Sequence, residues 1–116
     1  MKLADIVTRL DLKVACGGDL LDRPVASGYA SDMLSDVLAN ATADTVWITR
    51  QAHQNVVAVA SLLGLAAIVL VNCPPPSAAM LAKAEEENIP VLTSTLSAYE
   101  VSGRLFALGL EGSKRD

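Results

Sequence analysis

The sequence predicts a single α/β domain, a layered structure with a mostly parallel sheet flanked by helices. Segments with strand character begin near residues 25, 46, 67 and 90, about 22 residues apart, with helical segments between them. Strands and helices that alternate in this way form parallel sheets with right-handed crossovers. Residues 67–71 are apolar throughout, as expected of a central strand that is covered on both faces. The chain of 116 residues is 52% hydrophobic, which is enough for one core.

The amino-terminal quarter is expected to contain a helix, a turn and the first strand. Apolar residues recur at helical spacing over residues 3–10, which predicts a short amphipathic helix. A brief apolar segment at residues 14–16 ends at the glycine pair 17–18, where we expect a turn. Residues 25–29 are typical of a short strand, and Ser31-Asp32 stands where it can cap the next helix.

The later elements follow the same alternation. They are expected, in order, as a helix at about 33–41, a strand at 45–49, a helix at about 52–63, a strand at 67–71, a helix at about 77–87, a strand at 91–93 and a helix at about 97–110. The prolines at 74–76 end one strand because proline supplies no ladder donor, and Ser97 with Glu100 forms a capping box. We expect one domain over residues 1–116, with its core over about 3–110 and a frayed tail at 111–116.

The last helix carries more apolar surface than one core face can use. Tyr99, Phe106 and Leu110 lie roughly on one side of it, and Val101, Leu105 and Leu108 lie on another. A helix that is apolar on two sides is usually buried on two sides. The second side therefore predicts a subunit interface and a homodimer, although a chain end that wraps over its own core fits the same pattern.

The charge distribution disfavours nucleic acid and membrane partners. The formal net charge is −4, and the nine basic residues are scattered without a basic stripe. The most apolar stretch, residues 56–71, is interrupted by Ser61 and Gly64 and falls short of the ~20 residues that span a bilayer. Asp5 stands where a secretory signal would be apolar, so we expect a cytoplasmic protein.

The cysteines give no indication of a metal or a cofactor. Cys16 and Cys73 lie far apart and form no C-x-x-C pair, so they are expected to be ordinary buried thiols. His53 is the only histidine, which leaves too few soft ligands in one chain for a zinc or iron–sulfur site. No metal and no cofactor are expected.

A candidate ligand site is expected where the parallel strands end. In open α/β sheets, ligands bind beyond the carboxyl ends of the strands, where helix N-termini and loop side chains converge. The candidate contacts are the polar residues of the loops at these ends: Ser31, Asp32, Thr49, Arg50, Gln51, His53, Asn55, Thr93 and Ser94. The loop after residue 49 is the most polar, and Arg50 beside exposed backbone N–H groups suits a carboxylate or a phosphate.

The same residues also fit plain structural roles. Gln51 or His53 can cap the following helix, Arg50 can pair with a surface acid, and Asp32 can complement a helix dipole. Motifs for enzymatic chemistry are absent: there is no phosphate loop, dinucleotide fingerprint, nucleophile elbow or H-E-x-x-H sequence. We therefore expect a domain without catalytic residues.

Several segments together resemble the DRTGG domain family. The resemblance extends over residues 3–110 and rests on five segments: Gly-Tyr-Ala-Ser-Asp-Met-Leu-Ser-Asp-Val-Leu at 28–38, Trp-Ile-Thr at 47–49, Gln-Ala-His-Gln-Asn-Val-Val-Ala-Val-Ala at 51–60, Leu-Thr-Ser at 92–94 and Ser-Ala-Tyr-Glu at 97–100 followed by Gly-Arg-Leu at 103–105. The pentapeptide that gives the family its name is absent, and residues 22–26 are the nearest stretch.

The resemblance implies a regulatory role. Domains of this family accompany CBS domains in some pyrophosphatases, and they are similar to the N-terminal domain of HPr kinase/phosphorylase. The resulting hypothesis is a non-catalytic regulatory module that dimerises and binds a small anionic metabolite or a nucleotide. The alternative is an accessory subunit without a ligand that docks on a larger redox or metabolic enzyme, such as a hydrogenase.

Overall fold

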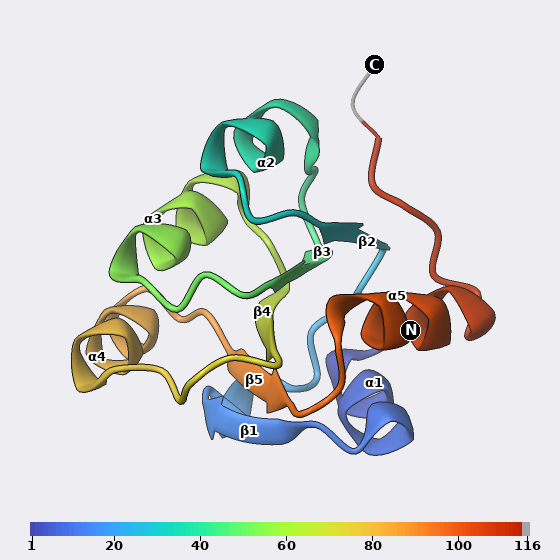
Figure 1. Cartoon of the computed structure of the whole chain (residues 1–116), viewed down its shortest axis with the longest axis horizontal. Helices are drawn as coiled ribbons and strands as arrows, with labels where there is room; N and C mark the ends of the chain where they lie inside the picture. The colour runs from blue at the N-terminus through green and yellow to red at the C-terminus, as the bar shows by residue number, and fades with distance from the viewer. Residues whose placement is uncertain (115–116) are drawn as a thin grey trace.

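The computed structural model describes residues 1–114 and contains one five-stranded sheet between two helical layers (Figure 1). The elements are, in chain order, α1 (Leu3–Leu10), β1 (Lys13–Cys16), the 3₁₀ turn η1 (Gly18–Leu20), β2 (Ser27–Ala30), α2 (Leu34–Asn40), β3 (Thr45–Thr49), α3 (Gln54–Leu63), β4 (Ala67–Val71), α4 (Ala78–Glu86), β5 (Val91–Ser94) and α5 (Ala98–Ala107). The predicted α/β class with a mostly parallel sheet is confirmed.

The strand order in the sheet is β1-β5-β4-β3-β2. Strands β2, β3, β4 and β5 are parallel, and β1 pairs antiparallel with β5. The sequence indicated only a brief apolar segment at 14–16, and the structure extends it to a four-residue edge strand. Gly17 ends this strand with φ +84°, a conformation that favours glycine, and a Cβ there would lie 2.7 Å from Pro90 Cα.

The two faces of the sheet have separate cores. Helices α2, α3 and α4 cover one face, and Trp47, Ile68 and Met80 are fully buried there. Helices α1 and α5 cover the other face, over Leu3, Ile6 and the inward residues of the strands. Strands β3 and β4 are buried along their whole length, because side chains alternate between two covered faces.

The carboxyl-terminal segment departs from the sequence prediction. Residues 111–116 were expected to be frayed, but residues 111–113 lie along the outer edge of β2. Gly28 N donates to Glu111 O at 2.9 Å, and Ser113 N donates to Gly28 O at 2.8 Å. Ser113 is buried, and its hydroxyl accepts from Thr42 N at 2.9 Å. The segment therefore satisfies the free hydrogen-bonding groups of an edge strand; residues 115–116 lie outside the described part.

Helix α5 is shorter than expected and has one free apolar side. It ends at Ala107, before Gly109 with φ +97°, so the predicted end at 110 was wrong. Val101 and Leu105 are buried in the core, whereas Tyr99 and Phe106 are 87% and 68% exposed. Leu110, which was expected on the side of Tyr99 and Phe106, lies beyond the helix and is buried in the core, so this part of the prediction was wrong. Whether a second subunit covers the exposed side stays a prediction.

Candidate functional site

The loops at the carboxyl ends of β2 to β5 meet at one edge of the sheet, because these strands are parallel. Strand β1 runs in the opposite direction, so its first residue, and not its last, lies at this edge. The register confirms this, since Lys13 pairs with Thr93 near the end of β5. The antiparallel edge strand therefore adds a cation to a rim that is otherwise built from strand ends.

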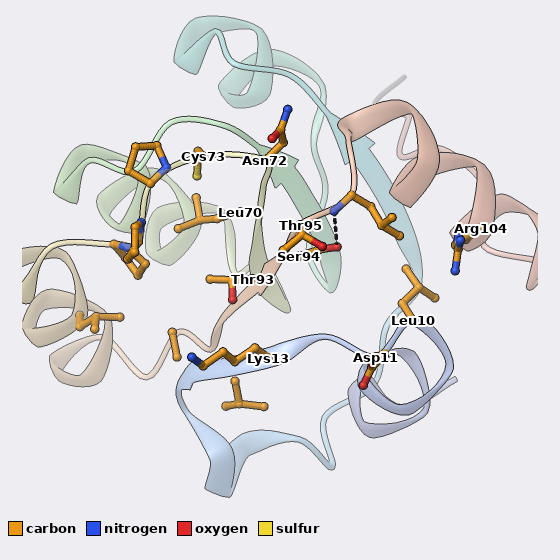
Figure 2. Close-up of a pocket in the computed structure, with 17 residues that line it drawn as sticks. Leu10, Asp11, Lys13, Leu70, Asn72, Cys73, Thr93, Ser94, Thr95 and Arg104 are labelled. Atoms are coloured by element: carbon orange, nitrogen blue, oxygen red, sulfur yellow. Dashed lines mark hydrogen bonds between the residues drawn. The ribbon is translucent and has the colours of Figure 1, made fainter.

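A cleft of about 990 Å³ opens at this rim, over the ends of β4 and β5 and the start of β1 (Figure 2). Its polar lining comes from Asp11, Lys13, Asn72, Cys73, Thr93, Ser94, Thr95 and Arg104. Its apolar lining comes from Leu10, Val14, Ala15, Leu70, Pro74, Pro75, Pro76, Leu81 and Leu96. A volume of this size accommodates a small metabolite, for which pockets of roughly 300–1,000 Å³ are usual.

The turn after β4 is held in an uncommon conformation at the cleft. Asn72 has φ +43°, which only a few per cent of non-glycine residues adopt and which asparagine tolerates best. Its N–H donates to Ser94 O at 3.0 Å, and its carbonyl accepts from Arg50 Nε at 3.2 Å. The backbone of Asn72 thus ties the ends of β4 and β5 together and fixes Arg50 at the margin of the cleft.

The turn after β5 is ordered by its own hydroxyl groups. Ser94 Oγ accepts from Leu96 N at 3.1 Å, and Ser97 Oγ caps α5 by accepting from Glu100 N at 3.2 Å. The hydroxyls of Thr93 and Thr95 form no hydrogen bond with any residue in 1–114. Two hydroxyl groups on an ordered turn therefore remain available to a ligand.

The charges of the cleft are mainly positive. No carboxylate within residues 1–114 forms an ion pair with Lys13. Arg104 Nε lies 3.6 Å from Glu100 Oε2, and both side chains are more than half exposed, so water weakens this pair. Asp11 is the single acid among the lining residues. An anion that enters the cleft meets Lys13 and Arg104, with Arg50 at its margin.

Most polar groups of the loop after β3, in contrast, bind one another. Asp32 Oδ1 accepts from Thr49 Oγ1 and from Arg50 N, both at 2.8 Å. Gln51 Nε2 donates to Asp32 O at 3.2 Å. His53 is the N-cap of α3, and its Nδ1 accepts from Asn55 N at 3.0 Å. These contacts correspond to the capping alternative that the sequence left open.

The structure therefore divides the sequence-predicted contacts into two groups. Thr93 and Ser94 line the cleft, and Arg50 reaches its margin through Asn72. The others form the neighbouring part of the rim without lining the cleft: Ser31, Asp32, Thr49, Gln51, His53 and Asn55. Ser31 Oγ accepts from Met33 N at 3.1 Å, so it serves the turn before α2. Ligand binding by all nine residues stays a prediction.

Cys73 lies in the cleft as a neutral thiol. Burial raises the pKa of Cys73, while the nearby positive charge of Arg50 acts in the opposite direction. Burial also raises the pKa of Cys16, which lies in the core beneath α4. A neutral thiol is a poor nucleophile and a poor metal ligand. Among residues 1–114, no three histidine, cysteine or acidic side chains are grouped so as to hold a metal ion.

Sequence reasoning missed the residues that complete the cleft. Lys13 and Asp11 belong to a strand and a helix end that carry no recognisable motif, and Arg104 lies in the last turn of α5. Asn72 and the prolines at 74–76 were visible as a strand end and its stop. The loop Asn72-Cys73, directly after the central strand, was expected at the rim, but neither it nor the prolines were chosen as candidate contacts.

Comparison with known proteins agrees with this architecture. The model of the DRTGG domain family matches residues 5–108. A solved structure of the CBS and DRTGG domains of the regulatory region of Clostridium perfringens pyrophosphatase, in complex with its activator diadenosine tetraphosphate, superposes with a TM-score of 0.68. The sequences are 14% identical, and the alignment covers 89% of this chain but 45% of that chain. At this identity the likeness shows the fold alone.

Two further results are negative. A search of curated proteins finds no match to the sequence. Within residues 1–114, no helix is both long enough and apolar enough to cross a membrane.

Proposed function

Because the chain belongs to the DRTGG domain family, we propose that it is a regulatory domain that binds a small anionic metabolite. The cleft between the rim ends of β1, β4 and β5 is the proposed site. Lys13, Arg104 and Arg50 supply the positive charge, and Thr93, Ser94 and Thr95 supply hydroxyl groups. The other residues that the sequence predicted as contacts stabilise the neighbouring loops of the rim through hydrogen bonds within the fold.

One observation carries the proposal: polar groups without partners in residues 1–114 converge on the cleft. The polar side chains of the neighbouring loop, such as those of Asp32, Thr49 and His53, are instead bound within the fold. Lys13 and the hydroxyls of Thr93 and Thr95 are open to solvent, and they lie on one rim beside an arginine. Hydrogen bonds from such groups to an anion are about twice as strong as those between neutral groups.

The structural neighbour supports a regulatory interpretation. The regulatory region of that pyrophosphatase binds a dinucleotide activator, and this chain matches 45% of the chain that was solved. We include nucleotides among the proposed ligands for this reason.

The first experiment is a thermal shift assay on the full chain with AMP, ADP, ATP, diadenosine tetraphosphate and pyrophosphate at about millimolar concentration. We expect at least one anion to raise Tm, and no shift with any of them would contradict the proposal.

Lys13→Met should weaken binding about tenfold, the usual effect of losing a hydrogen bond to a charged group. Lys114→Met is the matched control, because Lys114 follows Ser113 at the opposite edge of the sheet.

A second variant tests the sign of the charge effect. Asp11→Asn removes the single acid among the lining residues and keeps the side-chain shape. Asp11 has φ +53°, which asparagine adopts readily, so the change introduces little backbone strain. We expect this variant to bind the same anion several-fold more tightly, because a repulsive charge is lost. Weaker binding would argue against an anionic ligand.

We further propose that the domain acts in the cytoplasm and is not catalytic. Its two cysteines are free thiols, which is typical of a reducing compartment. Cys73 is held neutral and His53 is engaged as a helix cap, so neither is prepared for nucleophilic or acid–base chemistry. Turnover of ADP or pyrophosphate by the purified chain would contradict this proposal.

A separate observation supports a homodimer formed through α5. The exposed side of this helix presents Tyr99 and Phe106 with Gly103 between them, and a Cβ at Gly103 would meet nothing within 4 Å. Glycine inside a helix costs about 1 kcal/mol relative to alanine, and we propose that a close contact with a second subunit offsets this cost. Native mass spectrometry should show a dimer that Phe106→Ser dissociates. A monomer that instead co-purifies with a larger enzyme would favour the accessory-subunit alternative.

A further inference from the structure

The cleft has two chemically different ends, which restricts what can fill it (Figure 2). One end is lined by the prolines at 74–76 together with Leu70 and Leu81. The other end is formed by the turn Ser94-Thr95-Leu96, with Leu10, Asp11 and Arg104 beyond it. Lys13 lies between the two ends, beside its register partner Thr93. A ligand that uses the whole cleft must therefore be apolar at one end and anionic at the other.

The proline end provides a rigid apolar wall. Proline fixes its own backbone torsion and biases the residue before it, so three prolines in succession lose little entropy when a ligand binds. Pro74 and Pro75 are exposed and line the cleft. Leu81, on α4, is half-buried and adds to the apolar lining of the same cleft. A flat ring that lies against this wall buries apolar surface and breaks no hydrogen bond of the protein.

On the basis of the function proposed above, we propose that the ligand is a nucleoside phosphate bound in one orientation. Its base lies against Pro75, Pro76 and Leu81, and its phosphate lies over Thr93–Thr95 between Lys13 and Arg104. Pyrophosphate alone would leave the proline wall and most of the 990 Å³ unused. An uncharged nucleoside would leave Lys13 without an anionic partner and Arg104 with only its exposed pair to Glu100. A molecule that joins a planar base to a phosphate matches both ends.

The test compares ADP, pyrophosphate and adenosine by calorimetric titration of the full chain. We expect ADP to bind at least about tenfold more tightly than pyrophosphate or adenosine. The apolar end and the cationic end of the cleft should each contribute to the binding free energy of ADP. Pro75→Ser should weaken ADP binding several-fold and leave pyrophosphate binding unchanged. Lys13→Met should weaken both ADP and pyrophosphate binding. The controls are Pro24→Ser, an exposed proline outside the cleft, and Lys114→Met, and neither should change any of the affinities.

The outcomes separate this inference from the function on which it rests. If pyrophosphate binds as tightly as ADP and Pro75→Ser changes nothing, the nucleoside assignment is wrong while anion binding stands. If adenosine binds as tightly as ADP, the phosphate assignment is wrong. If none of the three binds and the thermal shift panel is also negative, the proposed function itself fails.

Discussion

Thr49 donates its hydroxyl proton to Asp32 across the ends of β3 and β2, with Oγ1 and Oδ1 2.8 Å apart. The same carboxylate oxygen accepts from Arg50 N at 2.8 Å. Thr49 is 1% exposed, so its hydroxyl has no water to replace this partner. Asp32 therefore joins two loops of the rim. These polar residues stabilise the rim although they do not line the cleft.

Thr49→Val should destabilise the fold without acting directly on a ligand. The isosteric change removes the hydroxyl donor and leaves Asp32 with one bond fewer, at a cost of about 1–2 kcal/mol in the free energy of unfolding. Urea denaturation measures this cost. Thr95→Val is the comparison, because Thr95 is exposed and lines the cleft. It should leave stability unchanged and weaken ADP binding, and the reverse pattern would contradict the assignment of the two hydroxyls.

Trp47→Phe tests how the core supports the rim. Trp47 is fully buried, and its Nε1 donates to Ser31 O at 2.8 Å. Phenylalanine leaves both a cavity and an unpaired carbonyl, so we expect a loss of about 2–4 kcal/mol in the free energy of unfolding. Chemical denaturation followed by far-UV circular dichroism measures it. A variant as stable as the parent would show that this hydrogen bond does not hold the loop after β2.

Ser113→Ala tests the docking of the carboxyl-terminal segment. The Ser113 hydroxyl accepts from Thr42 N at 2.9 Å and lies 2.8 Å from Thr42 Oγ1. Its removal leaves a partly buried N–H without an acceptor, which costs about 1–2 kcal/mol. Hydrogen exchange at Thr42 should accelerate in the variant. If neither stability nor exchange changes, the segment is frayed, as the sequence alone suggested.

Tyr29→Phe tests the acid dependence of stability near α2. Hydrogen bonds from Ser31 and then from Tyr29 lower the pKa of Asp36 below its ordinary value of 3.8, and Tyr29 Oη lies 2.7 Å from Asp36 Oδ1. A lowered pKa in the folded state gives stability that is present above the ordinary value and is lost as the pH falls through the folded value.

The variant should therefore differ from the parent more at about pH 7 than at a pH low enough to protonate the carboxyl group. Urea denaturation at the two pH values measures the difference. The carboxyl ¹³C signal of Asp36 should titrate at a higher pH in the variant. An equal loss of stability at both pH values would assign the effect to packing and not to the carboxylate.

The fold was largely predictable because its main signals are local. The uniform apolar run of β4 and the regular spacing of the strands are properties of short segments, and each indicates a parallel sheet by itself. Strand β1 was missed because a four-residue edge strand lacks that pattern, and its partner β5 is distant in the sequence. The docking of Ser113 on β2 was missed for the same reason.

The site was only partly predictable because polar sequence does not reveal which groups are free. The loop after β3 has the most polar residues, but Asp32, Gln51 and His53 satisfy one another and the backbone. Thr93 and Ser94 were identified from their place at a strand end. Lys13 reaches the rim only because β1 is antiparallel, which depends on topology and not on any local motif.

The most direct test is a titration of the ¹⁵N-labelled full chain with ADP, followed by amide chemical shifts. Binding in the cleft predicts that the largest shifts occur at Lys13, Asn72 and residues 93–96. The loop residues 51–55 should change little, because they lie outside the cleft. Shifts confined to residues 31–32 and 49–55, with none at Lys13 or Thr93, would contradict the placement of the site.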